Sequence, residues 1–154
     1  MNMEDKKQEI ISRLAALCAQ REVCASEARK KIEKWDTDNA LADSIIDCLK
    51  NERYIDEHRY CRAFIHDKMQ YNHWGEYKIA AALRQKSIPD NIVSETLAEI
   101  PPQQWQEILD IELKKKARQL KGDSYERRTR LIRFAMQRGF AYSLAEQCAA
   151  RIEE

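Results

Sequence analysis

The fold is decided by residues 54–89, which read YIDEHRYCRAFIHDKMQYNHWGEYKIAAALRQKSIP. Apolar residues in this stretch recur at spacings of three and four, which is typical of amphipathic helices. A similar stretch, LIRFAMQRGF, occupies residues 131–140. A repeat of about fifty residues indicates stacked helical units, and stacked units build extended surfaces. The sequence therefore predicts a chain that lies along a long partner.

The repeat is recognised by its apolar positions. When the copies are superimposed in sequence, Ile79 of the second copy matches Leu131 of the third and Ala28 of a more degraded first copy. Leu83 of the second copy matches Ile32 of the first. Each copy is close to the lower size limit for an independent core, so neighbouring copies are expected to share apolar surface.

Composition supports helices throughout. Charged residues make up 34% of the 154 residues, and there are only three glycines and three prolines, a combination that favours helix over turn-rich sheet. We predict an all-α fold, an elongated tandem array of three helix-turn-helix-like units of three helices each, covering residues 1–55, 56–100 and 103–154. Ser26 and Asp56 are the predicted N-caps of two of these helices.

No catalytic, cofactor or metal motif is recognisable in the sequence. The five cysteines are scattered and odd in number, without metal-ligand spacing, which is typical of thiols in a reducing cytosol. His58, His66 and His73 lie seven and eight residues apart, not at the spacing of four that places two ligands on one helix face. The N-terminus lacks the apolar core of a signal peptide, and no apolar run is long enough to cross a membrane. We expect a soluble, cytoplasmic protein that is not an enzyme.

Charge is distributed unevenly along the chain. Between residues 112 and 138, ten basic residues face three acids, so this segment carries +7 and the remainder carries −6 of a net +1. Local charge of this kind attracts anionic partners. The candidate residues for binding DNA or a protein partner are Arg59, Arg62, Arg84, Lys86, Lys114, Lys115, Arg118, Lys121, Arg127, Arg128, Arg130, Arg133 and Arg138.

Two interpretations of this basic segment remain open. Lys114, Arg118 and Lys121 are predicted to lie opposite an apolar stripe that runs from Trp105 to Leu120, where a partner could reach them. The alternative is a solvated helix face without a partner. The local excess of +7, with few interleaved acids, favours contact with phosphates or with an acidic protein.

Arg59, Arg62 and His66, spaced three and four apart, would extend this surface onto the second unit. Trp74 and Trp105 are candidates for stacking on bases. Burial in the core or at a hinge is the favoured alternative for both tryptophans.

Three segments, in the same order along the chain, resemble the RecX family of regulatory proteins. Residues 54–65, YIDEHRYCRAFI, resemble the central signature of the family, and residues 75–88 resemble the segment that follows it. RFAMQRGF at residues 133–140 is similar to the family's RFLxRRGF stretch. The chain departs from the family at residues 34–36, where a glycine-aromatic turn is common, and at Ser87, where glycine is usual.

The resemblance implies a bacterial regulator that binds the RecA recombinase and the filament that RecA forms on DNA. We expect the protein to be a monomer. Family members block filament growth or suppress ATPase, strand-exchange and coprotease activities. The implied partners are the RecA filament and, weakly, single- and double-stranded DNA. The alternative is a general nucleic-acid-binding helical module that acts without RecA.

Overall fold

The structure, a computed structural model, describes residues 2–153, and within that range it is helical without any strand. The predicted all-α class is confirmed. In chain order, the elements are α1 (Met3–Gln20), α2 (Ala25–Glu33), α3 (Asn39–Asn51), α4 (Glu57–Asp67), the π-helical turn η1 (Lys68–Asn72), α5 (Glu76–Gln85), α6 (Asp90–Ala98), α7 (Pro102–Ala117), α8 (Ser124–Gln137) and α9 (Tyr142–Ile152).

Short polar side chains start four of these helices. Asn2, Asp38, Asp56 and Asp123 each accept a hydrogen bond from the backbone N–H three residues further on, at 2.8–3.0 Å. Such bonds satisfy N–H groups that have no partner within the helix. The predicted cap at Asp56 is therefore confirmed.

The predicted cap at Ser26 is wrong. Helix α2 begins at Ala25, and Cys24 occupies the N-cap position. The Ser26 hydroxyl instead donates to the backbone carbonyl of Lys86, at 2.6 Å. The hydroxyl is thus used between two units rather than within its own helix.

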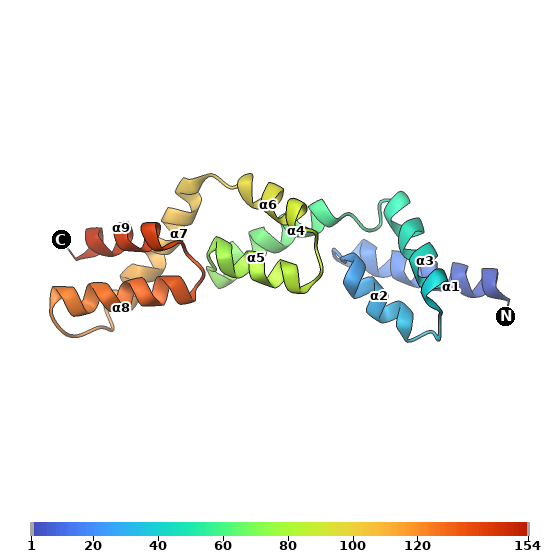
Figure 1. The fold of residues 1–154 in the computed structure, drawn as a ribbon, viewed down its shortest axis with the longest axis horizontal. Helices are drawn as coiled ribbons and strands as arrows, with labels where there is room; N and C mark the ends of the chain where they lie inside the picture. Colours follow the sequence, from blue (N-terminus) through green and yellow to red (C-terminus); the bar gives the residue numbers. More distant parts are fainter. Residues whose placement is uncertain (1, 154) are drawn as a thin grey trace.

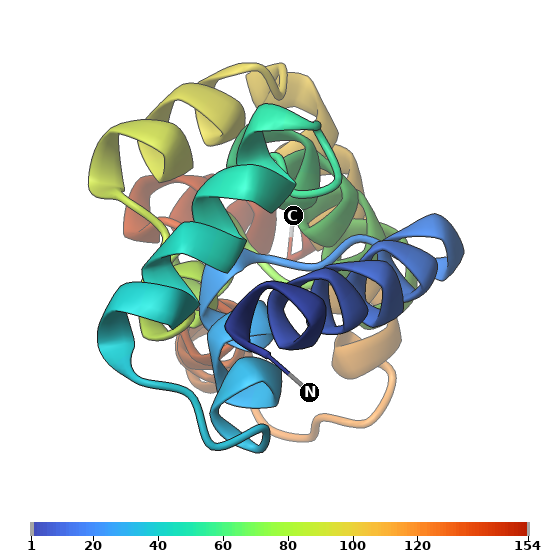
Figure 2. The same ribbon diagram turned by 90° about the vertical axis from the view of Figure 1, so that its right-hand side faces the viewer.

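The molecule is elongated, as predicted. Helices α1–α3, α4–α6 and α7–α9 follow one another from the N-terminal to the C-terminal end, and the two termini lie at opposite ends of the row (Figure 1). Seen along this row, the helices of the three units overlap in a compact outline (Figure 2).

The middle helices α2, α5 and α8 carry the repeat. The matched apolar side chains on these helices are fully buried, because each middle helix turns the same two positions inward. These residues are Ala28 and Ile32, Ile79 and Leu83, and Leu131 and Ala135.

Two apolar clusters form the core of the described chain. One belongs to α1–α3 and the residues flanking them, from Ile10 to Ile55. The other runs without interruption through the second and third units, from Tyr60 to Ala149, and also includes Cys24 of the first unit. The second and third units therefore share apolar surface, as expected for units of this size, whereas the first unit has a core largely its own.

The second and third units meet through backbone atoms. The N–H of Gly75 donates to the carbonyl of Arg138 at 2.7 Å, and the N–H of Tyr77 donates to the carbonyl of Gly139 at 2.9 Å. A Cβ on Gly75 would lie 2.4 Å from the backbone carbon of Gly139. The C-terminal end of α8 thus abuts the N-terminal end of α5, at a distance that only glycine permits.

The first and second units meet mainly through side chains. Besides the bond from Ser26, the N–H of Ala25 donates to a Glu57 carboxylate oxygen at 3.0 Å. The C-terminal end of α5 thus faces the N-terminal end of α2, which repeats the arrangement of α8 and α5. Here, however, a hydroxyl and a carboxylate make the contacts.

Candidate nucleic-acid interface

Of the exposed candidate cations at the C-terminal end of the row, Lys115 lies close to Glu112, and the other six make no such contact in the described chain. Lys114 is on α7, Arg118 caps the C-terminal end of that helix, and Lys121 lies in the following loop, while the other three, Arg128, Arg130 and Arg133, are on α8. None of the six has an ion-pair partner among residues 2–153. These six side chains, which we call the free cations, leave their positive charge available to an anionic partner.

The position of Lys121 differs from the sequence prediction. Helix α7 ends at Ala117, so Lys121 does not lie on the helix face opposite Trp105. Arg127 binds two carbonyls at and beyond this helix end. Its guanidinium donates to the carbonyl of Ala117 at 3.1 Å and to that of Leu120.

Arg127 itself is a structural residue. Besides those carbonyls, its Nε donates to the Glu153 carboxylate at 2.8 Å, and only 24% of its side chain is exposed. Arg127 therefore holds the end of α7, the start of α8 and the end of α9 together. Because Nε and both Nη atoms of this guanidinium already donate hydrogen bonds, few N–H groups remain to bind a phosphate.

Arg138 and Lys115 surround a nearly buried carboxylate. The Glu112 side chain is 11% exposed and lies 3.9 Å from both cations, and it accepts a hydrogen bond from His73 or pairs with it. Arg138 also donates to the carbonyl of Asn72 at 3.0 Å. These contacts join the second and third units, because a buried charge requires partners of opposite sign.

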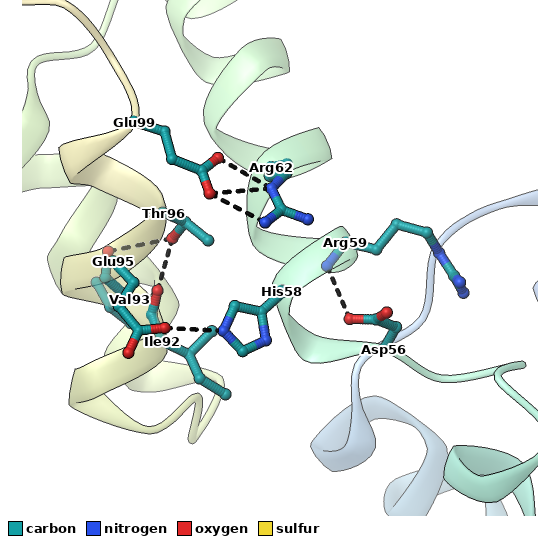
Figure 3. A network of polar contacts seen from close by, with 9 residues as sticks. All are labelled: Asp56, His58, Arg59, Arg62, Ile92, Val93, Glu95, Thr96 and Glu99. Atoms are coloured by element: carbon teal, nitrogen blue, oxygen red, sulfur yellow. Dashed lines mark hydrogen bonds and ion pairs between the residues drawn. The ribbon is translucent and has the colours of Figure 1, made fainter.

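On the second unit, Arg62 is engaged within its own unit. Its guanidinium binds both carboxylate oxygens of Glu99 at 2.9–3.2 Å, and Figure 3 shows this pair beside that of His58 and Glu95. The hydrogen bond from Arg62 lowers the pKa of Glu99. Both partners are well exposed, so the pair contributes little to stability.

Arg59 reaches into the first unit. Its Nε donates to the two carboxylate oxygens of Glu22 at 2.7 and 2.9 Å, and its Nη2 donates to the carbonyls of Arg53 and Tyr54 at 3.2 Å. In Figure 3 the side chain extends away from Arg62 and toward the first unit. The structure therefore separates the two arginines that the sequence placed on one surface.

Arg84 and Lys86 lie at the C-terminal end of α5. Arg84 pairs with Asp90 at 3.0 Å across the turn to α6, where both side chains are exposed. Lys86 is half-buried, and its carbonyl accepts the bond from Ser26. Both residues thus lie apart from the free cations, close to the junction of the first two units.

The candidate residues predicted from the sequence did not include two lysines of the second unit. The Nζ atoms of Lys68 and Lys78 lie 4.7 and 4.5 Å from the centre of the Trp74 ring. Trp105 is buried. Trp105 is thus in the core, as the favoured alternative predicted. Trp74 is half-buried: it packs against the core and also lies beneath the two lysines. The signal available in the sequence was a lysine on each side of an aromatic turn.

An aromatic surface beside the free cations was also missed. Tyr125, Met136 and Tyr142 are exposed by 79%, 50% and 55%. They lie along the outer side of α8 and α9, which pack against each other. The signal in the sequence was the presence of large apolar residues outside the buried stripe of Leu131 and Ala135.

Two of the buried cysteines are held in the protonated form. Burial raises the pKa of Cys61 and of Cys148 to about 11, so both thiols are protonated at neutral pH and unreactive. Among residues 2–153, no group of three or more histidine, cysteine or acidic side chains is arranged to hold a metal ion. No helix in this range is long and apolar enough to cross a membrane.

Two family models match the chain. The model described as RecX, second three-helix domain, matches residues 56–97, and the model described as RecX, third three-helix domain, matches residues 103–148. Together the two matches cover more than half of the chain.

Curated relatives carry the same family name. Regulatory protein RecX of Prosthecochloris aestuarii is 31% identical over 120 residues, which cover 78% of each chain. Regulatory protein RecX of Finegoldia magna is 29% identical over 120 residues, which are 76% of this chain but 58% of that protein. The chain thus spans little more than half the length of some of these relatives.

Solved structures share the fold. The crystal structure of RecX from Lactobacillus salivarius superimposes with a TM-score of 0.89 at 18% identity, covering 98% of this chain and 99% of that one. A second crystal structure, of regulatory protein RecX, gives a TM-score of 0.86 at 21% identity, covering 96% of this chain and 74% of that one. At these identities the likeness shows the architecture alone.

Proposed function

The chain belongs to the RecX family, and from this premise we propose that it regulates the RecA recombinase by binding the filament that RecA forms on DNA. In this proposal it inhibits filament growth, and with it the ATPase, strand-exchange and coprotease activities. The observation that carries the proposal is an elongated row of helical units with six free cations at one end.

The charge distribution suggests which units contact DNA and which contact RecA. Residues 103–154 carry a net charge of +3, concentrated between residues 112 and 138, whereas residues 1–100 carry −2. The C-terminal end therefore suits phosphates, and the other units suit a protein surface. A nucleoprotein filament presents both along its length. We propose the division 1–55, 56–100 and 103–154, with the third unit toward DNA and the first two toward RecA.

The experiment is a titration of the protein into RecA filaments on single-stranded DNA, with ATP hydrolysis and filament length as readouts. Suppression at concentrations below that of RecA is the expected result, because one molecule bound at a filament end or groove interrupts a cooperative polymer. Unchanged hydrolysis and length at excess protein would refute the proposal.

The alternative is a nucleic-acid-binding module that acts without RecA, favoured by the free cations alone. Such a module draws its affinity from phosphate neutralisation, so its binding falls steeply with salt. A filament regulator retains a salt-tolerant component from apolar and hydrogen-bonded contacts with protein. Measuring binding to bare DNA and to RecA filaments over the same salt series separates the two.

A further inference from the structure

A groove between α8 and α9 combines exposed aromatic rings with free cations. We call it the α8–α9 groove; its lining includes Tyr125, Arg128, Thr129, Ile132, Tyr142 and Glu146. A second hollow continues from it along α8, sharing Thr129 and Ile132 and extending to Arg133 and Met136. Helices α8 and α9, which line the groove, lie at the C-terminal end of the row (Figure 1).

The two tyrosines lie toward opposite ends of this groove. Helix α9 contributes Tyr142 at one end and Ala150 at the other, a separation of about 12 Å at 1.5 Å per residue. Tyr125, from the first turn of α8, lies at the end where Ala150 is, because the two helices are connected by a short turn and run antiparallel. The rings are thus too far apart to stack on each other, and both remain open to solvent.

The charge of the groove favours an anionic occupant. Arg128 lines the groove and Arg133 lines its continuation along α8, both without an ion-pair partner among the described residues. Glu146 is the acid in its lining, and the hydrogen bond between this carboxylate and the Tyr142 hydroxyl raises the pKa of Tyr142. Glu146 keeps its negative charge, but two arginines oppose it, so the groove and its continuation along α8 carry a net +1.

An occupant that is both anionic and rich in flat apolar faces fits these features best. Unpaired bases on a phosphate backbone have both properties, and base–aromatic stacking beside cationic side chains is how single strands are bound without sequence preference. A duplex covers the faces of its bases, so it would meet only the arginines.

We propose that the α8–α9 groove binds single-stranded nucleic acid, with bases stacked on Tyr125 and Tyr142 and phosphates on Arg128 and Arg133. This rests on the proposed function and deepens it, because it names the strand and the contacts by which the third unit reaches the nucleic acid.

The test is fluorescence anisotropy with a labelled oligothymidylate in the absence of RecA. The double variant Tyr125→Leu, Tyr142→Leu keeps apolar side chains but removes both rings. Each lost stacking contact lowers affinity about fivefold or more, so the double variant should bind about 25-fold more weakly. Tyr125→Phe, Tyr142→Phe keeps the ring faces and should bind like the unaltered protein.

Two controls isolate the groove. Tyr71 and Tyr77 are exposed by 79% and 61% and lie outside it, so Tyr71→Leu, Tyr77→Leu should leave oligothymidylate binding unchanged. A duplex of the same length should bind the leucine variant of the groove as it binds the unaltered protein. Arg128→Gln, Arg133→Gln should instead flatten the salt dependence for the single strand by about 1.4 units of slope.

Several results would overturn the proposal. These are undiminished oligothymidylate binding by the leucine variant of the groove, an equal loss for duplex, or an equal loss in the phenylalanine variant. If the leucine variant of the groove no longer inhibits RecA but still binds oligothymidylate, the groove binds a protein partner instead. If the leucine variant binds oligothymidylate as well as the unaltered protein does, and the unaltered protein inhibits RecA, this inference is wrong but the proposed function stands.

Discussion

At the scale of single residues, the turns are the most informative positions. Ser87 has φ 60° where the equivalent residue of the third unit, Gly139, has φ 93°. Asp36 closes the corresponding turn of the first unit with φ 56°. The turn geometry therefore persists where glycine is absent, although a left-handed residue with a side chain costs about 1 kcal/mol or more.

This cost predicts a stabilising substitution. Ser87 is exposed, and its side chain makes no hydrogen bond in the described chain. Ser87→Gly should raise the free energy of unfolding by about 0.5–1 kcal/mol, because relief of the left-handed strain exceeds the added freedom of the unfolded chain. Urea denaturation measures the change.

A matched control lies on the neighbouring helix. Ser94 is exposed within α6, so Ser94→Gly should lower the free energy of unfolding by about 0.5–1 kcal/mol. Changes of the same sign at both positions would contradict the assignment of strain to Ser87.

Asp56 makes the start of α4 sensitive to pH. The hydrogen bond from the Arg59 N–H lowers the pKa of Asp56 below that of the unfolded chain. The ionised cap therefore contributes stability above the unfolded pKa of about 3.9, and this contribution is lost as the pH falls through the folded value.

Asp56→Ala should accordingly lower the free energy of unfolding by about 1 kcal/mol at neutral pH. The difference from the unaltered protein should narrow below about pH 4. Asp56→Asn, which keeps the acceptor without the charge, is the control: it should lose only the part that depends on the charge and so cost less than the alanine variant at neutral pH. Urea denaturation across the pH range measures both, and a constant difference for the alanine variant would contradict the role of the ionised cap.

At the scale of elements, α7 and the loop that follows it supply half of the free cations. Lys114, Arg118 and Lys121 are exposed and distant from the buried stripe of α7. Replacing all three with Gln should leave stability within about 0.5 kcal/mol per site. Binding to DNA should weaken, and its salt dependence should flatten by about two to three units of slope.

The control removes the same charge from the first unit. Lys30, Lys34 and Lys50 are exposed there, and replacing these three with Gln should leave the salt slope of DNA binding unchanged. Equal slopes for both triple variants, measured by anisotropy over a salt series, would mean that the α7 cations are only a solvated surface.

At the scale of the whole molecule, the two junctions differ. Gly75 and Gly139 bring the second and third units into backbone contact beside one continuous core. Side-chain bonds, among them the pair of Arg59 and Glu22, dominate the junction with the first unit. A substitution that adds a single carbon should therefore affect the two junctions very differently.

Gly75→Ala should lower the free energy of unfolding by about 2 kcal/mol or more, because its Cβ meets backbone atoms that cannot move aside. Cys24 occupies the equivalent N-cap position at the other junction and already carries a Cβ. Denaturation of Gly75→Ala reports the loss, and a change below about 0.5 kcal/mol would contradict the close contact of the two units.

The outline of the molecule gives a further expectation. A compact globule of this length has a radius of gyration of roughly 15 Å. Three units in a row must exceed that value, and small-angle X-ray scattering measures it. A radius equal to the compact value would contradict the row.

The sequence by itself determined the helical class, the repeat and the buried positions. Ile79, Leu83, Leu131 and Ala135 are buried as their spacing predicted. Helical periodicity is a local property, since side chains three and four apart share a face wherever the helix lies. The cap at Asp56 was predictable for the same reason, because its partner is only three residues away.

Only the tertiary structure decided which cations are available to a partner. Arg59 binds Glu22 across 37 residues and Arg127 binds Glu153 across 26, whereas Arg130 is left without such a partner in the described chain. In the net charge of a sequence segment, a paired arginine such as Arg59 or Arg127 counts the same as the unpaired Arg130. Pairing depends on which helices are brought side by side, and spacing within a single helix does not contain that information.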